Sequence, residues 1–137
     1  MKRLQILLAE DNRGDVMLVR EALKTHDIDH ELHVVPDGDR ALHFVATMGT
    51  SEGGPCPDVL LLDLNLPKVD GTEVLKEFRQ HPACVATPVI VVSSSDAARD
   101  RKKMEALHIA HYFKKPSDFD AYMKLGDVIR QVVTDAR

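Results

Sequence analysis

The fold of this chain is decided by the stretch VLLLD at residues 59–63. Four consecutive apolar residues that end on an acid predict a short strand buried on both faces, as strands are in parallel α/β sheets. A similar run, residues 6–9, ends on the acidic pair Glu10 and Asp11. Because ligand sites of parallel sheets lie at the carboxyl ends of the strands, the sequence predicts that three carboxylates meet at one edge.

Strand-like and helical segments alternate along the chain, which predicts repeated βα units in a single domain spanning residues 1–137. The fold expected is α/β, with a doubly wound, five-stranded parallel sheet flanked by five helices. Its strands are expected at 6–9, 31–35, 59–62, 89–92 and 110–113. Helical spacing predicts helices near 16–23, 41–48, 70–78 and 97–107, and a last one capped by Ser117 with Asp120.

The residues that follow these strands form one chemical set. Glu10 and Asp11 follow the first strand, Asp63 the third, Ser93 the fourth and Lys115 the fifth. Crowded carboxylates repel one another unless a cation binds them, and oxygen ligands favour Mg²⁺. The chain contains no glycine-rich loop of the kind that cradles a nucleotide. We therefore expect a magnesium-assisted phosphoryl site in which Asp63 is the acceptor.

Composition excludes several classes of partner. The net charge is −4 and the basic residues form no long block, so nucleic acid is not expected as a partner. Neither a span of roughly 20 apolar residues nor a signal peptide is present, so we expect a cytoplasmic protein without a membrane partner. Cys56 and Cys84 are expected to be two reduced thiols without a chemical role, and the histidines to be surface residues rather than zinc ligands.

Four spaced motifs carry a family resemblance. The chain resembles the receiver domain of two-component response regulators, the CheY-like superfamily with a flavodoxin-like (βα)5 fold. Within it, the chain is most similar to single-domain regulators paired with bacterial phytochrome-type histidine kinases. The family motifs are residues 10–12, 61–67 with 70–71, 91–94 and 112–116; the features of the narrower group are Asp15, the long loop 49–57 and residues 118–120.

The resemblance implies a role for each site residue. Asp63 would attack the phosphoryl group on a kinase histidine and form an aspartyl phosphate. Magnesium would be bound by Asp11, Asp63 and the main-chain carbonyl of Asn65, with Glu10 in contact directly or through water. Lys115 would pair with a phosphoryl oxygen.

The resemblance also implies how phosphorylation is read out. The hydroxyl of Ser93 would donate to another phosphoryl oxygen, although a shift of one residue would select Ser94 instead, and Tyr112 would turn from exposed to buried. With no separate output domain, the output would be docking of a downstream protein, whose identity the sequence does not give. A homodimer could form through the last two helices and the fifth strand.

Two other functions compete with this interpretation. Haloacid-dehalogenase-type phosphatases also phosphorylate an aspartate at the end of a strand, but they usually need a second aspartate two residues on, where this chain has Asn65. A receiver-like module that binds partners without phosphorylation is the other alternative, although none of the acids or the lysine is missing. The resemblance favours a phosphoacceptor over an enzyme, with slow self-dephosphorylation at most.

Overall fold

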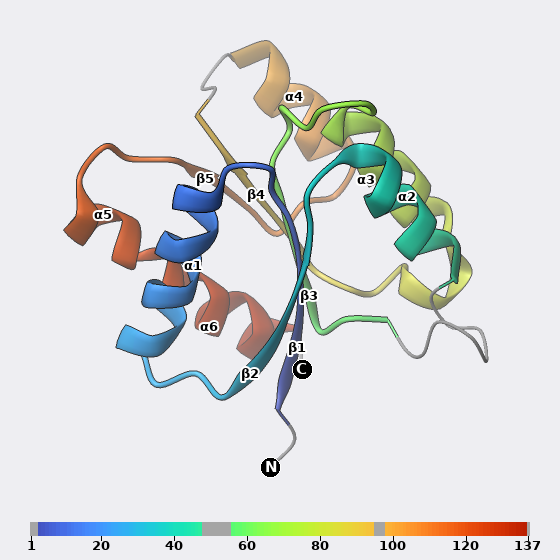
Figure 1. Ribbon diagram of the computed structural model, residues 1–137. Coiled ribbons are helices and arrows are strands. Elements are labelled where there is room, and N and C mark those ends of the chain that lie inside the picture. The colour runs from blue at the N-terminus through green and yellow to red at the C-terminus, as the bar shows by residue number, and fades with distance from the viewer. Residues whose placement is uncertain (1–2, 48–55, 95–97, 137) are drawn as a thin grey trace.

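The computed structural model describes residues 3–47, 56–94 and 98–136 (Figure 1). One parallel sheet has the strand order β2-β1-β3-β4-β5, which confirms the predicted α/β class and doubly wound sheet. Its strands are β1 (Leu4–Ala9), β2 (His30–Val35), β3 (Val59–Leu62), β4 (Val89–Ser93) and β5 (His111–Lys114). The helices are α1 (Arg13–Thr25), α2 (Gly38–Thr47), α3 (Gly71–Gln80), α4 (Ala98–Ala106), α5 (Phe119–Met123) and α6 (Leu125–Asp135), with a 3₁₀ turn η1 (Pro82–Cys84).

Helices cover both faces of the sheet. In Figure 1, α1, α5 and α6 lie on one side, and α2 and α3 lie on the other. Successive strand residues point to opposite faces, so the two cores draw on alternate positions of the same strands. Leu60 and Leu62 of β3 belong to the core beneath α2 and α3, whereas Leu61 belongs to the core beneath α1 and α6. This double coverage explains why β3 is apolar at every position.

The C-terminal helix differs from its prediction. A turn at Lys124 divides it into α5 and α6, although the backbone there stays in the right-handed helical region. Asp118, rather than Ser117, caps α5: its side chain accepts the Ala121 N–H at 3.0 Å. The predicted cap, Ser117, therefore precedes the observed cap, Asp118, by one residue. At the start of α3, the predicted cap Asp70 accepts the Thr72 N–H at 2.7 Å.

The prediction of two reduced thiols is wrong in this structure, because Cys56 and Cys84 form a disulfide. Their Cα atoms are 5.7 Å apart despite a sequence separation of 28. Cys56 lies shortly before β3 and Cys84 shortly before β4, and these two strands are paired in parallel. Adjacent parallel strands begin at the same edge of the sheet, so the two cysteines meet there although they are distant in sequence.

Arg79, near the end of α3, holds two loops in place. Its guanidinium donates to the carbonyls of Thr87 at 2.8 Å, His108 at 3.0 Å and Leu107 at 3.1 Å, with a longer contact of 3.5 Å to Val85. Burial lowers the pKa of Arg79 from its ordinary value. The side chain therefore ties the loop before β4 to the loop before β5.

Across residues 3–47, 56–94 and 98–136, the longest helices remain too short and too polar to span a lipid bilayer.

Candidate metal and phosphoryl site

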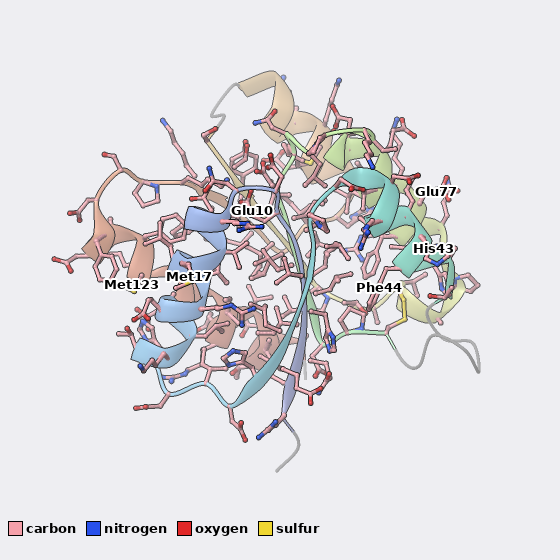
Figure 2. The ribbon with its side chains drawn as sticks, in the orientation of Figure 1. Glu10, Met17, His43, Phe44, Glu77 and Met123 are labelled. Carbon is pink, nitrogen blue, oxygen red and sulfur yellow. A yellow bond between two sulfur atoms is a disulfide. The ribbon has the colours of Figure 1, made fainter. Side chains whose placement is uncertain are left out.

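Three carboxylates meet where β1 and β3 end. Ala9 and Leu62 are partners in the parallel ladder, so the next residues, Glu10 and Asp63, leave the sheet side by side. Glu10 is 2% exposed and Asp63 5% exposed, whereas Asp11 is exposed to solvent. One oxygen from each of the three groups lies within 4.8 Å of the others. In Figure 2 Glu10 is labelled at the end of β1, above the body of the sheet.

Lys115 brings a single ammonium to this acidic cluster. Its Nζ atom is 2.7 Å from Glu10 Oε1, 2.9 Å from Asp15 Oδ2 and 3.0 Å from Asp63 Oδ2. The Lys115 backbone N–H donates to the Ser93 carbonyl at 2.7 Å and so fixes the residue just beyond β5. The structure therefore brings together Glu10, Asp11, Asp63 and Lys115, as the sequence predicted.

The proton affinities in the cluster reflect burial and pairing. Burial raises the pKa of Glu10 to about 7, and the neighbouring Asp63 charge acts in the same direction, against the lowering effect of Lys115. Burial alone would lower the pKa of the Lys115 ammonium. Hydrogen bonds to Glu10 and Asp15, together with the charge of Asp63, outweigh that effect and hold the pKa above its ordinary value. Lys115 is therefore a fixed positive charge at neutral pH.

Sequence reasoning did not assign Asp15 to the site. It lies in the first turn of α1, whose cap Asn12 accepts the Asp15 N–H at 2.9 Å. This turn aims the Asp15 carboxylate at Lys115. In the sequence Asp15 marks only the narrower group of regulators, because the strand-end pattern points to residues that follow strands and not to a lysine contact made from a helix.

The loop after Asp63 is held close to the site. The Asn65 N–H donates to Asp63 Oδ1 at 3.0 Å, which leaves Oδ2 facing Lys115. The Gly71 N–H donates to the Leu64 carbonyl at 3.0 Å, and α3 begins there in close contact with the loop. A Cβ on Gly71 would lie 2.4 Å from the Asp63 carbonyl oxygen, so no larger residue fits without movement.

The proposed readout residues Ser93, Ser94 and Tyr112, and the proposed metal ligand Asn65, have different environments. Ser93 is fully buried at the end of β4, while Ser94 is exposed. Tyr112 of β5 is half-buried and packs against the core beneath α2 and α3. The Asn65 side chain is exposed. The roles of these four residues in phosphorylation stay predictions.

The donor set fits a hard divalent cation. Three carboxylates lie within reach of one another, and Lys115 supplies only one positive charge to offset them. Oxygen donors without sulfur or nitrogen are the ligands that Mg²⁺ prefers. The residues present can therefore hold the cation that the sequence predicted.

A parallel five-stranded sheet with an acidic cluster and a lysine at its carboxyl edge is the arrangement of a receiver-like α/β protein. The chain belongs to the response regulator receiver domain family, whose model matches residues 6–125. This confirms the resemblance drawn from the four motifs.

Within the receiver family, the chain is similar to particular response regulators. The chain is 42% identical over 120 residues to the response regulator Rcp1 of Synechocystis sp., an alignment that covers 88% of this chain and 82% of Rcp1. Its structure resembles the phosphorylated cyanobacterial phytochrome response regulator RcpA with a TM-score of 0.87 and 33% identity, over 99% of this chain and 97% of RcpA. The Mn²⁺-bound form of Rcp1 matches with a TM-score of 0.82 and 41% identity, over 93% of this chain and 92% of that structure. The predicted similarity to phytochrome-associated regulators is therefore confirmed.

Proposed function

We propose that the protein is a single-domain response regulator in which Asp63 accepts a phosphoryl group from a sensor histidine kinase. The observation that supports this most is the position of Lys115 Nζ, 3.0 Å from Asp63 Oδ2 inside a cluster of acids. A lysine that only stabilises the fold needs one carboxylate partner, whereas Lys115 has three, Glu10, Asp15 and Asp63. An ammonium among three carboxylates is suited to meet the oxygens of an incoming phosphoryl group.

In the proposed reaction a carboxylate oxygen of Asp63 attacks the phosphorus atom of the phosphohistidine. The new P–O bond forms as the P–N bond breaks, and the imidazole leaves with the bonding electrons. The Asn65 N–H and Lys115 Nζ contact different oxygens of Asp63 and so fix the orientation of the carboxylate. Formation of the aspartyl phosphate, a mixed anhydride, removes the carboxylate charge of Asp63 and frees Lys115 to pair with phosphoryl oxygens.

We infer that the cation is Mg²⁺. Glu10, Asp11, Asp63 and the main-chain carbonyl of Asn65 would hold it. Bound there, it would neutralise negative charge on the phosphoryl oxygens. With Glu10 buried, a cation also relieves the repulsion that helps to raise the pKa of this group.

The phosphorylated aspartate would be read out through β4 and β5. A phosphoryl group carries about −1.5 to −2 charges and strong acceptor oxygens, which can draw a hydroxyl from Ser93, or from Ser94 after a shift, toward the site. Tyr112 lies opposite Val91 in the ladder between these strands, so a movement after β4 has a direct route to it. Its half-buried state leaves room for the proposed inward turn.

The proposed partners follow from the family. Sensor histidine kinases are the expected phosphodonors, and similarity to Rcp1 and RcpA supports a phytochrome-type kinase, acting in the cytoplasm. The protein would act as a phosphoacceptor that loses its phosphate slowly, and it would signal by docking a downstream protein or a second copy through the face around α4, β5 and the C-terminal helices. Neither nucleic acid nor a membrane is part of the proposal.

The test is intact-protein mass spectrometry after incubation with Mg²⁺ and a small phosphodonor. We expect a single phosphoryl adduct that is absent from Asp63→Asn and from chelated protein, and present in a control, Asp120→Asn, which changes an exposed aspartate outside the site. No adduct on folded wild-type protein would refute the proposal and favour a module that works without phosphorylation. Continuous release of phosphate from a phosphate ester would favour the phosphatase alternative.

A further inference from the structure

A second group of potential metal ligands lies at the opposite edge of the sheet. One donor atom each from Cys56, His81 and Cys84 lies within 4.8 Å of the other two. Cys56 lies before the first residue of β3, and His81 and Cys84 lie between α3 and β4. Asp63 and Ser93 stand at the other ends of these strands, so about 13 Å of sheet separates the two sites at roughly 3.3 Å per residue. Figure 2 shows the disulfide as a yellow bond well away from Glu10.

We propose that Cys56, His81 and Cys84 bind a thiophilic divalent cation such as Zn²⁺ once the disulfide is reduced. Two thiolates and one imidazole are a recognised zinc ligand set, with a fourth position left for water. Two thiolates also cancel the charge of the ion, so the bound site is neutral. Neutrality suits a pocket in which Cys84 is fully buried while Cys56 and His81 are half-buried.

The local backbone already places the histidine for this role. His81 ends α3 and caps η1, where its Nδ1 atom accepts the Ala83 N–H at 3.3 Å. That acceptor role shows that the imidazole is held against the turn that carries Cys84. The hydrogen bond is long and exposed, so a metal can replace it as the partner of the ring at small cost.

The chemistry requires a two-electron reduction first. One thiolate of a dithiol reductant attacks one sulfur, which breaks the S–S bond, releases the other cysteine as a thiol and leaves a mixed disulfide. The second thiol of the reductant then attacks the mixed disulfide and leaves as part of a cyclic disulfide, so that each cysteine sulfur has gained one electron and one proton. The cation then displaces the two thiol protons to solvent. Oxidised protein has no thiolate to offer, so metal and disulfide exclude one another.

The two sites select different ions. Oxygen donors around Asp63 favour Mg²⁺, whereas sulfur and imidazole favour Zn²⁺ or Co²⁺. Binding at the cysteines can therefore be measured with the acidic site saturated by Mg²⁺. The proposal does not depend on phosphorylation of Asp63.

The experiment is a Co²⁺ titration of the full chain in excess Mg²⁺, after reduction with a phosphine that consumes one water per disulfide and leaves as its oxide. We expect one equivalent of Co²⁺ to produce the thiolate-to-cobalt absorption band, and Zn²⁺ to displace it. Oxidised wild type should give no band. Cys56→Ser should lose it, and this variant avoids the buried Cys84, whose replacement endangers folding.

His81 is tested by His81→Asn, which keeps a side-chain acceptor for the Ala83 N–H. Affinity for Zn²⁺ should fall by more than the roughly 10–100-fold that loss of an outer partner costs. The matched control is His43→Asn, on the exposed face of α2, and should bind as wild type does. Absence of the cobalt band in reduced wild type, or unchanged Zn²⁺ affinity in Cys56→Ser or His81→Asn, would overturn the proposal.

Discussion

Reduction of the Cys56–Cys84 disulfide should cost about 3.6 kcal/mol of the free energy of unfolding. The cross-link closes a loop with a sequence separation of 28. In the chain-entropy model, a loop of this length removes about 12 cal/mol/K of entropy from the unfolded ensemble, which gives about 3.6 kcal/mol near 25 °C. The Cα separation of 5.7 Å falls in the usual range for disulfides, so we subtract nothing for a distorted backbone.

The assay is urea unfolding followed by far-UV circular dichroism, because the chain has no tryptophan to report by fluorescence. With a slope of about 2 kcal/mol per molar urea, the midpoint of the reduced protein should be lower by about 1.8 M. Both samples contain a chelator, so that no cation restabilises the thiols. The oxidised form should also show the smaller slope, since its cross-linked unfolded state exposes less surface.

Cys56→Ser serves as the matched control for this prediction. Its midpoint should equal that of reduced wild type and should not change with reductant. If oxidised and reduced wild type differ by less than about 0.5 M urea, the loop-closure reasoning is wrong for this protein.

Three further predictions concern other parts of the structure. Because burial raises the pKa of Glu10 from 4.5 to about 7, the folded state retains a proton that the unfolded state loses, so metal-free stability should fall as pH rises across that interval. Glu10→Gln should flatten this fall in urea midpoints; an unchanged profile would contradict it. Arg79→Met removes the donor from several carbonyls and should lower the free energy of unfolding by about 2–4 kcal/mol. The control Arg20→Met, at an exposed arginine, should cost about 0.5 kcal/mol or less. Equal losses in the two variants would show that Arg79 does not stabilise the loops before β4 and β5. Gly71→Ala should cost about 1–3 kcal/mol and slow phosphoryl uptake at the adjacent loop, whereas Gly14→Ala, near only the Asn12 side chain, should leave uptake unchanged.

The strand-end residues were predictable because parallel topology is itself encoded in the apolar runs. A run such as residues 59–62 can be buried only between two layers of helices, and the residue after it must emerge at the ligand edge. That rule predicted the positions of Glu10, Asp63 and Lys115. In the structure both carboxylates lie within hydrogen-bonding distance of Lys115 Nζ. Strand boundaries were off by at most two residues, because ladder pairing, rather than hydrophobicity, sets where a strand begins, and the first two helices begin three residues before their predicted starts.

The sequence did not allow us to predict contacts between residues that are far apart along the chain. The disulfide depends on β3 and β4 being neighbours, which the linear separation of its cysteines conceals. The Asp15 contact depends on the direction of a side chain in the first turn of α1. Arg79 reads as an ordinary charged helix residue until the two loops that it joins are placed beside it. Such contacts follow from three-dimensional packing, for which the sequence holds no local signal.

The position of the disulfide also bears on how the native chain opens locally. Just before β3 and β4 begin, the side chains of Cys56 and Cys84 are joined covalently, which limits how far these ends can separate while the bond is intact. Partial opening that exposes backbone amides to exchange with water should therefore start from the carboxyl ends, beside Asp63 and Ser93. Hydrogen exchange in the oxidised protein should be fastest near the phosphoryl site and slowest near the cross-link, and reduction should diminish that gradient. A covalent bond at one edge would thus concentrate native fluctuations at the edge where signalling chemistry is proposed.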